Sequence, residues 1–244
     1  MIHLTTLNFI DMEIGETERN CLMITTLSDY ICRSMPQCGD FSTNPNLRKK
    51  VDDEGNLLPY VGNTVVFLLD NTTKESLMRL QESLYQAAPE MLAHPLQMST
   101  FHMTLHDLAN GTPEQPGLRD SMSCAREQVS LILPGLKNTP PLRMKTTWLF
   151  NMVNTSIVLG LTPADAETWN RLDEMYMALE SVVPLGYALT PHITMAYFRP
   201  GTYNSEQVRR LSEALRNVNL DITLHTEELV LQNFSDMNHY MTIL

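Results

Sequence analysis

Two histidines, His102 and His192, each stand two residues before a threonine in the pattern His-x-Thr-apolar. The first motif reads HMTL from His102 and the second reads HITM from His192. A single match is expected by chance about once in several hundred residues at average amino-acid usage. The pair, rather than either motif alone, therefore indicates chemistry.

The residue types in this pair suit phosphoester chemistry. Imidazoles titrate near neutrality, so one can accept a proton from an attacking hydroxyl or water while the other protonates the leaving oxygen. Two are needed because the entering and leaving oxygens of an in-line displacement lie on opposite sides of phosphorus. The hydroxyls of Thr104 and Thr194 can donate hydrogen bonds to the non-bridging oxygens. The motifs therefore predict catalysis by His102 and His192, with both threonines binding phosphate.

Each motif is expected to lie on a β-strand, where side chains alternate between faces. One face of the first strand would carry His102, Thr104 and His106, and one face of the second would carry His192, Thr194, Ala196 and Phe198. His106 and Phe198 are therefore further candidate substrate-binding residues, His106 lining a groove and Phe198 stacking on a base. A structural hydrogen-bonding role for His106 and core packing for Phe198 remain open alternatives.

The elements around the motifs form a weak internal repeat. The first half has an apolar strand pattern at 64–69 and a helix pattern at 73–88, and the second half has a strand at 156–161 and a helix at 163–183 capped by Thr162. A further helix pattern follows each motif, at 118–131 and 205–217. These patterns predict an α+β fold of two similar lobes, although an α+β domain without duplication is the alternative.

The predicted domain spans 46–244, with approximate halves 60–140 and 141–244 that exchange elements. Residues 1–45 read as an N-terminal extension, partly helical over 16–35 and rich in Pro, Gly and Asn near its end. The role of this extension does not follow from its sequence.

The amino-acid composition limits the kinds of molecule that the protein can bind. The formal net charge of −11 opposes binding along a long nucleic acid, so a small substrate is expected. No apolar run is long enough to span a membrane, and the N-terminus lacks a secretory pattern, so we expect a cytoplasmic protein without membrane contact. Four cysteines without a C-x-x-C pair indicate reduced thiols. The oligomeric state does not follow from the sequence.

No metal or other cofactor is expected. His102 and His106 are four residues apart, a spacing that places two zinc ligands on one face of a helix. No glutamate follows His102, however, and on a strand this spacing separates the two residues by about 13 Å, which is too far for one ion.

The HMTL and HITM motifs resemble those of the 2H phosphoesterase superfamily, over roughly residues 46–244. The resemblance implies two α+β lobes, each an antiparallel sheet with helices on its outer side, flanking a groove that holds both motifs. It also implies metal-independent action on 2′,3′-cyclic phosphates or 2′-5′ diesters, with His102 and His192 as the acid–base pair and Thr104 and Thr194 as phosphate ligands. Many RNA-processing members carry an arginine after the second motif, where this chain has Ala196, Tyr197 and Phe198.

The leading hypothesis is a cyclic phosphodiesterase acting on a nucleotide, a short RNA end or a related small molecule. A module that binds nucleotides or RNA ends without turnover is one alternative, and an RNA ligase-like transferase is another. The sequence does not assign the acid and the base, because the two motifs are nearly equivalent.

Overall fold

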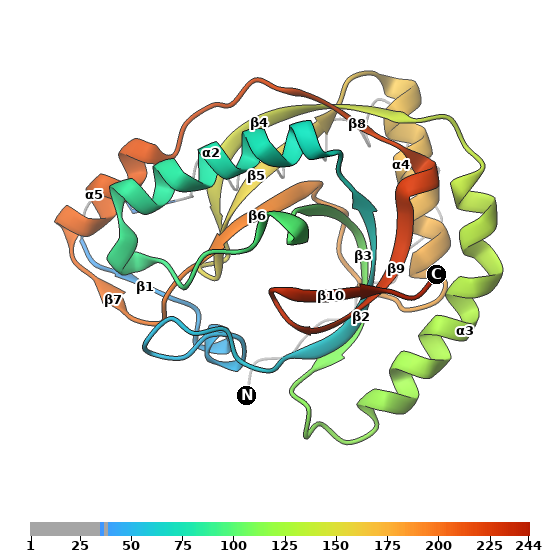
Figure 1. The fold of residues 1–244 in the computed structure, drawn as a ribbon, viewed down its shortest axis with the longest axis horizontal. Helices are drawn as coiled ribbons and strands as arrows, with labels where there is room; N and C mark the ends of the chain where they lie inside the picture. Colours follow the sequence, from blue (N-terminus) through green and yellow to red (C-terminus); the bar gives the residue numbers. More distant parts are fainter. Residues whose placement is uncertain (1–34, 37–38) are drawn as a thin grey trace, which may run out of the picture.

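The computed structural model describes residues 35, 36 and 39–244. Its centre is one eight-stranded antiparallel sheet, which is curved in Figure 1. The strand order is β10-β9-β2-β3-β6-β5-β4-β8. The strands are β2 (Val61–Leu68), β3 (His102–Gly111), β4 (Leu142–Met152), β5 (Ser156–Pro163), β6 (His192–Tyr197), β8 (Asp221–Leu224), β9 (Leu229–Asp236) and β10 (His239–Thr242).

The sheet divides into two groups of four strands that meet where β3 pairs with β6. The first lobe holds β10, β9, β2 and β3, and the second holds β6, β5, β4 and β8. The C-terminal hairpin β9–β10 therefore completes the sheet of the first lobe, because β9 pairs with β2. A division of the chain at residue 140 does not follow the lobes in this region.

The described residues form four α-helices: α2 (Asn71–Ala87), α3 (Leu118–Lys137), α4 (Ala166–Glu180) and α5 (Ser205–Ala214). Helix α3 packs on β3, β9 and β2 of the first lobe, and α4, although it follows β5, also contacts β3 and α3. Helix α2 follows β2 but contacts β6 and pairs with α5. Helix α2 therefore lies against the second lobe, whereas α4 contacts both lobes, because it also packs on β4 and β5.

Helices α2 and α4 begin in the same way. The carboxylate of Asp70 accepts a hydrogen bond from the amide of Thr73 at 2.8 Å, and that of Asp165 accepts one from Thr168 at 2.8 Å. Each carboxylate satisfies an amide that has no partner within its helix. The expectation that Thr162 caps α4 is wrong, because β5 continues to Pro163 and the helix begins after Asp165.

The end of the predicted N-terminal extension is packed onto the main fold. Strand β1 (Phe41–Ser42) pairs with β7 (Thr202–Tyr203), and a 3-10 helix, η1 (Pro45–Lys49), follows. The ring centroid of Phe41 lies 4.9 Å from that of Phe198. The predicted helix at 16–35 and three of the four cysteines lie outside the described residues, apart from residue 35, whereas Cys124 is an exposed free thiol. No helix of the described residues is long and apolar enough to cross a membrane.

Candidate active site

A cavity of about 700 Å³ lies at the junction of β3 and β6. Its lining includes both predicted catalytic histidines and both predicted phosphate-binding threonines, His102, Thr104, His192 and Thr194. All four side chains are partly exposed, whereas Met103 and Ile193, the residues between them, are fully buried. The alternation expected of a strand thus presents the four polar side chains to one space.

The strand register relates the two motifs by an approximate two-fold axis. Met103 of β3 lies directly opposite Ile193 of β6 in an antiparallel pair. One step to either side, the register places Thr194 opposite His102 and Thr104 opposite His192. Directly opposite residues have Cβ atoms about 4.5–5.5 Å apart. Each imidazole therefore neighbours the hydroxyl of the other motif, across the strand pair.

Backbone carbonyls orient both rings. Nδ1 of His192 lies 2.7 Å from the carbonyl oxygen of Thr190, and the ring of His102 is hydrogen-bonded to the carbonyl of Thr100. A carbonyl can only accept, so Nδ1 of His192 carries a proton and Nε2 is the nitrogen that exchanges protons with a ligand. The repeated pattern is therefore Thr-x-His-x-Thr, which extends the predicted motif by two residues on its N-terminal side.

Both threonine hydroxyls are available to a ligand. Within the part of the chain that the structure describes, neither the Thr104 nor the Thr194 hydroxyl forms a hydrogen bond with another residue. A hydroxyl that faces a cavity can donate to an anion that enters it. The two pairs therefore offer two donors and two titratable nitrogens to one site.

Each motif strand bulges immediately after its threonine. On β3 the register with β2 skips Leu105, and on β6 the register with β5 skips Met195. One extra residue reverses which side chains face the cavity beyond that point. Beyond the two bulges the cavity is lined by Asp107 on β3 and by Tyr197 on β6.

The bulge at Met195 corrects the prediction for Phe198. Without it Phe198 would share a face with His192, but with it Tyr197 takes that face. Phe198 is fully buried, packs against Phe41 and does not line the cavity. Core packing, the alternative reading, therefore describes Phe198.

His106 borders the cavity, but its side chain has no exposed surface. Nε2 lies 3.1 Å from Oε1 of Glu180, and the ring packs against Tyr176 at 5.1 Å between centroids. The same Glu180 oxygen accepts a hydrogen bond from the amide of Leu185. His106 thus ties β3 to the end of α4 and to the loop that leads to the second motif, which matches the structural alternative.

The two catalytic candidates differ in electrostatic environment. Burial lowers the pKa of His102 to about 4, and the positive charges of His192 and Lys74 act in the same direction. Burial also lowers the pKa of His192, but its hydrogen bond to the carbonyl of Thr190 and, to a smaller extent, the nearby carboxylate of Asp107 act in the opposite direction. Asp107 acts on His192 because β3 runs antiparallel to β6, so the residues beyond Thr104 lie on the His192 side. His192 is therefore the imidazole that holds a proton more readily.

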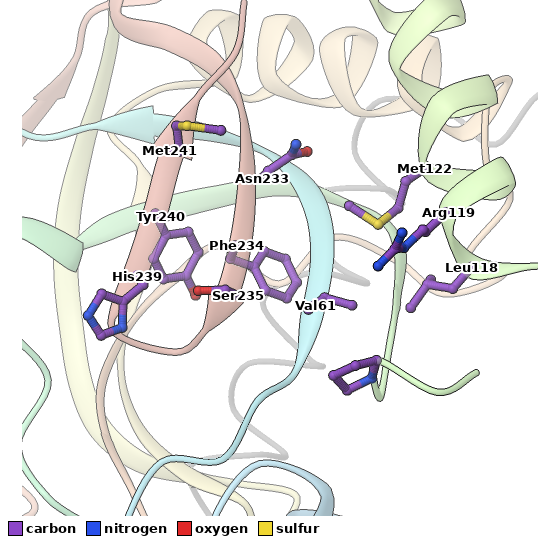
Figure 2. Close-up of a pocket in the computed structure, with 11 residues that line it drawn as sticks. Val61, Leu118, Arg119, Met122, Asn233, Phe234, Ser235, His239, Tyr240 and Met241 are labelled. Carbon is purple, nitrogen blue, oxygen red and sulfur yellow. The ribbon is translucent and has the colours of Figure 1, made fainter. Parts of the chain in front are cut away.

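Tyr240 covers His102 from the C-terminal hairpin. The two ring centroids are 5.0 Å apart in an edge-on arrangement, and burial raises the pKa of Tyr240 well above its ordinary value. Figure 2 shows Tyr240 and Phe234 side by side on the β9–β10 hairpin, where both also line a smaller pocket of about 430 Å³ beneath α3. An uncharged phenol against His102 excludes water and contributes to the burial that lowers the pKa of that imidazole.

Lys50 places a cation at the cavity. Its ammonium lies 4.7 Å from the ring centroid of Tyr60 and 5.8 Å from that of Tyr197. No ion pair to another described residue involves Lys50, so its charge is available to an anionic ligand. Among the described residues, no group of three or more His, Cys, Asp or Glu side chains is arranged to hold a metal ion.

The prediction from sequence missed Asp107, Tyr197, Tyr240 and Lys50. The sequence carries no signal for Asp107, because the bulge at Leu105 that directs it into the cavity has no local marker. Tyr240 and Lys50 lie outside the repeat, near the two ends of the predicted domain. The Thr-x-His-x-Thr repeat was the signal that could have identified the two orienting carbonyls.

No model of a known family and no curated protein sequence matches this chain. Solved structures do match it. ATU0111, a conserved protein of unknown function from Agrobacterium tumefaciens str. C58, is 19% identical with a TM-score of 0.59, and the match covers 84% of this chain and 93% of that one. E. coli LigT complexed with 3′-AMP is 12% identical with a TM-score of 0.50, and the match covers 76% of this chain and 96% of that one. At these identities the likeness concerns the fold alone, so the α+β prediction is confirmed and the chain shares the fold of ATU0111 and E. coli LigT.

Proposed function

We propose that the chain is a metal-independent phosphodiesterase that opens a 2′,3′-cyclic phosphate or cleaves a 2′-5′ diester of a nucleotide or short RNA end. The observation that carries the proposal is the placement of two imidazole–hydroxyl pairs opposite one another on β3 and β6, lining one cavity. In-line displacement at phosphorus requires an acid and a base on opposite sides of the phosphate. The two-fold register supplies that arrangement.

The electrostatic difference between the two histidines supports a proposed assignment of the acid and the base. His102, with its pKa lowered to about 4, is neutral at pH 7 and acts as the general base. His192 acts as the general acid, because the charge of Asp107 favours its protonated form. A bound phosphate anion favours protonation further, which compensates for the effect of burial on His192.

The proposed hydrolysis proceeds in one displacement. The base, His102, removes a proton from water as the water oxygen bonds to phosphorus. The ester bond to the ribose oxygen breaks, and His192 donates its proton to that oxygen. Thr104 and Thr194 donate hydrogen bonds to the non-bridging oxygens, where negative charge increases. Proton exchange with solvent then restores the two imidazoles.

The size and charge of the cavity favour a small substrate. About 700 Å³ is within the range of sites that hold a small ligand, and Lys50 adds a positive charge at the cavity of a chain whose net charge is −11. E. coli LigT has been solved in complex with 3′-AMP, and we propose a ligand of that class for this cavity.

The test is to incubate the full chain with the four nucleoside 2′,3′-cyclic phosphates and a 2′-5′-linked dinucleotide, with and without EDTA. We expect turnover of at least one substrate at an unchanged rate in EDTA. Loss of activity in EDTA would contradict the metal-free scheme. Binding of nucleotides without turnover of any substrate would instead support a binding module, and joining to a 5′-hydroxyl RNA end would identify a transferase.

A further inference from the structure

The turn between β4 and β5 holds a valine in an unfavourable backbone conformation. Val153 has φ 47° and Asn154 has φ 60°, and the amide of Thr155 donates a hydrogen bond to the carbonyl of Met152 across them. A two-residue turn with both φ values positive favours Asn and Gly. A β-branched residue in this region is an outlier, since its Cβ crowds the backbone.

Hydrogen bonds hold this turn from several sides. The amide of Asn44 donates to the carbonyl of Asn154 at 2.9 Å, and the amide of Asn154 donates to Oδ1 of Asn151 at 3.0 Å. The side chain of Asn154 donates to the carbonyl of Ser42 at 3.1 Å. Strained conformations persist where the surroundings fix them in this way, and they concentrate at functional sites.

The strained backbone conformation of Val153 does not place its side chain in the core. The side chain of Val153 remains 53% exposed, although it lines the same cavity as His102 and His192. Its backbone cost is therefore not compensated by burial in the core. An apolar group presented at a cavity is instead available to a ligand.

A second apolar side chain is presented to this cavity in a similar way. Tyr187, in the loop between α4 and β6, is 60% exposed and lines the cavity. Its carbonyl accepts a hydrogen bond from the Tyr176 hydroxyl at 2.6 Å, and the preceding Gly186 adopts φ 73°. The loop backbone is thus anchored while the ring stays uncovered.

We infer that Val153 and Tyr187 contact the nucleobase of the substrate, so that the cavity selects phosphates that carry a planar heteroaromatic ring. This inference rests on the proposed function and adds a specificity determinant to it. Aromatic and aliphatic side chains pack on the faces of a base without reading its hydrogen-bonding edge. Anchored loops bind with a smaller loss of conformational freedom than mobile ones. The selection is therefore for the presence of a base more than for its identity.

The test is calorimetric binding of adenosine 2′-monophosphate and of ribose 5-phosphate, which lacks a base, to the full chain. We compare the wild-type chain with Val153→Gly, Val153→Leu and, as a control, Leu131→Ala, which removes an exposed apolar side chain of α3 that does not line the cavity. We expect Val153→Gly to weaken adenosine 2′-monophosphate binding about tenfold, the effect of exposing one valine-sized surface, without changing ribose 5-phosphate binding. Val153→Leu and Leu131→Ala should retain both affinities.

Val153→Gly should also raise the melting temperature, because glycine adopts positive φ without strain. A variant that melts higher but keeps the full preference for adenosine 2′-monophosphate would overturn the inference. Equal affinity of the wild-type chain for the two ligands, or binding of neither, would also overturn it. Because binding is measured apart from turnover, a chain that binds as expected without hydrolysis would contradict the proposed function and leave this inference supported.

Discussion

The His102 and His192 halves of the cavity share a backbone plan but not an electrostatic environment. Each half has a histidine oriented by the carbonyl of a threonine two residues earlier, a threonine two residues later and a bulge directly after that threonine. Beyond the bulge the halves diverge, with Asp107 on β3 and Tyr197 on β6. A symmetric backbone framework can therefore hold two unlike imidazoles, since residues outside the repeated motif, such as Asp107 and Tyr240, give each a different environment.

Each motif strand carries a residue that lies near the histidine of the other strand. Because β3 and β6 are antiparallel, the residue beyond each bulge lies near the histidine of the other motif. Asp107 thus favours the charged form of His192, while Tyr240 from the C-terminal hairpin packs against His102. In the proposed reaction the two lobes therefore depend on each other, because each lobe contributes to the environment of the other lobe's histidine.

The largest expected effect comes from removing the histidines. We expect His102→Ala and His192→Ala each to lower kcat/KM by about 10²–10⁴-fold, as for one general acid or base. The double variant should be little worse than either single variant, because groups that act as a unit are not additive. His94→Ala, an exposed histidine outside the cavity lining, is the control. Losses that multiply in the double variant would indicate two separate sites.

The second largest effect on kcat/KM is expected from removing the hydroxyls of Thr104 and Thr194. We expect Thr104→Val and Thr194→Val each to lower kcat/KM by about 10–100-fold, which is the usual effect of losing a hydrogen bond to a charged group. The two losses should be similar, because each hydroxyl neighbours the imidazole of the other motif. The serine variants, which retain the hydroxyl, should keep most of the activity. A loss of activity in only one of the two valine variants would contradict the predicted equivalence of the two hydroxyls.

The substitution Asp107→Asn tests the electrostatic difference between His102 and His192 through the pH dependence of kcat/KM. Removing the carboxylate lowers the pKa of His192, because Asp107 favours its protonated form. The general acid must be protonated, so the alkaline limb of the kcat/KM profile should move to lower pH. Tyr197→Phe, at the equivalent position of the other half, removes no charge and should leave that limb in place. An unmoved limb in Asp107→Asn would reject His192 as the acid.

The smallest expected effect is on stability. Asp70 and Asp165 cap α2 and α4 through the same hydrogen bond, so Asp70→Ala and Asp165→Ala should each lower the free energy of unfolding, Asp70→Ala by about 1 kcal/mol. Urea unfolding measures this, and kcat/KM should not change. Thr162→Ala is the control, because Thr162 lies in β5 and caps no helix. Unequal losses would show that the halves differ in stability as well as in charge.

Much of the fold and the centre of the site could be predicted because both follow local periodicity. The two-residue alternation of a strand placed His102 with Thr104 and His192 with Thr194, and the repeated strand–helix order indicated two lobes. The prediction fails at the bulges, since Leu105 and Met195 are ordinary strand residues and no glycine or proline marks the extra position. From that point the predicted face was wrong, so Phe198 was placed in the site and Tyr197 was missed.

Other features depend on contacts between distant segments. Pro163 reads locally as the first residue of a helix, but it ends β5 opposite Met144. Tyr240 reaches His102 only because the C-terminal hairpin returns to pair with β2, which no local pattern predicts. Asp107 acts on His192 through the antiparallel register of β3 and β6, which the motifs alone do not define.

The most direct test of the central claim is an NMR titration of the histidine side chains with inorganic phosphate. Convergence of the two motifs on one anion predicts that the imidazole resonances of His102 and His192 shift together, with one dissociation constant, while those of His94 do not move. Shifts of only one catalytic imidazole, or saturation of the two at different phosphate concentrations, would contradict a single shared site.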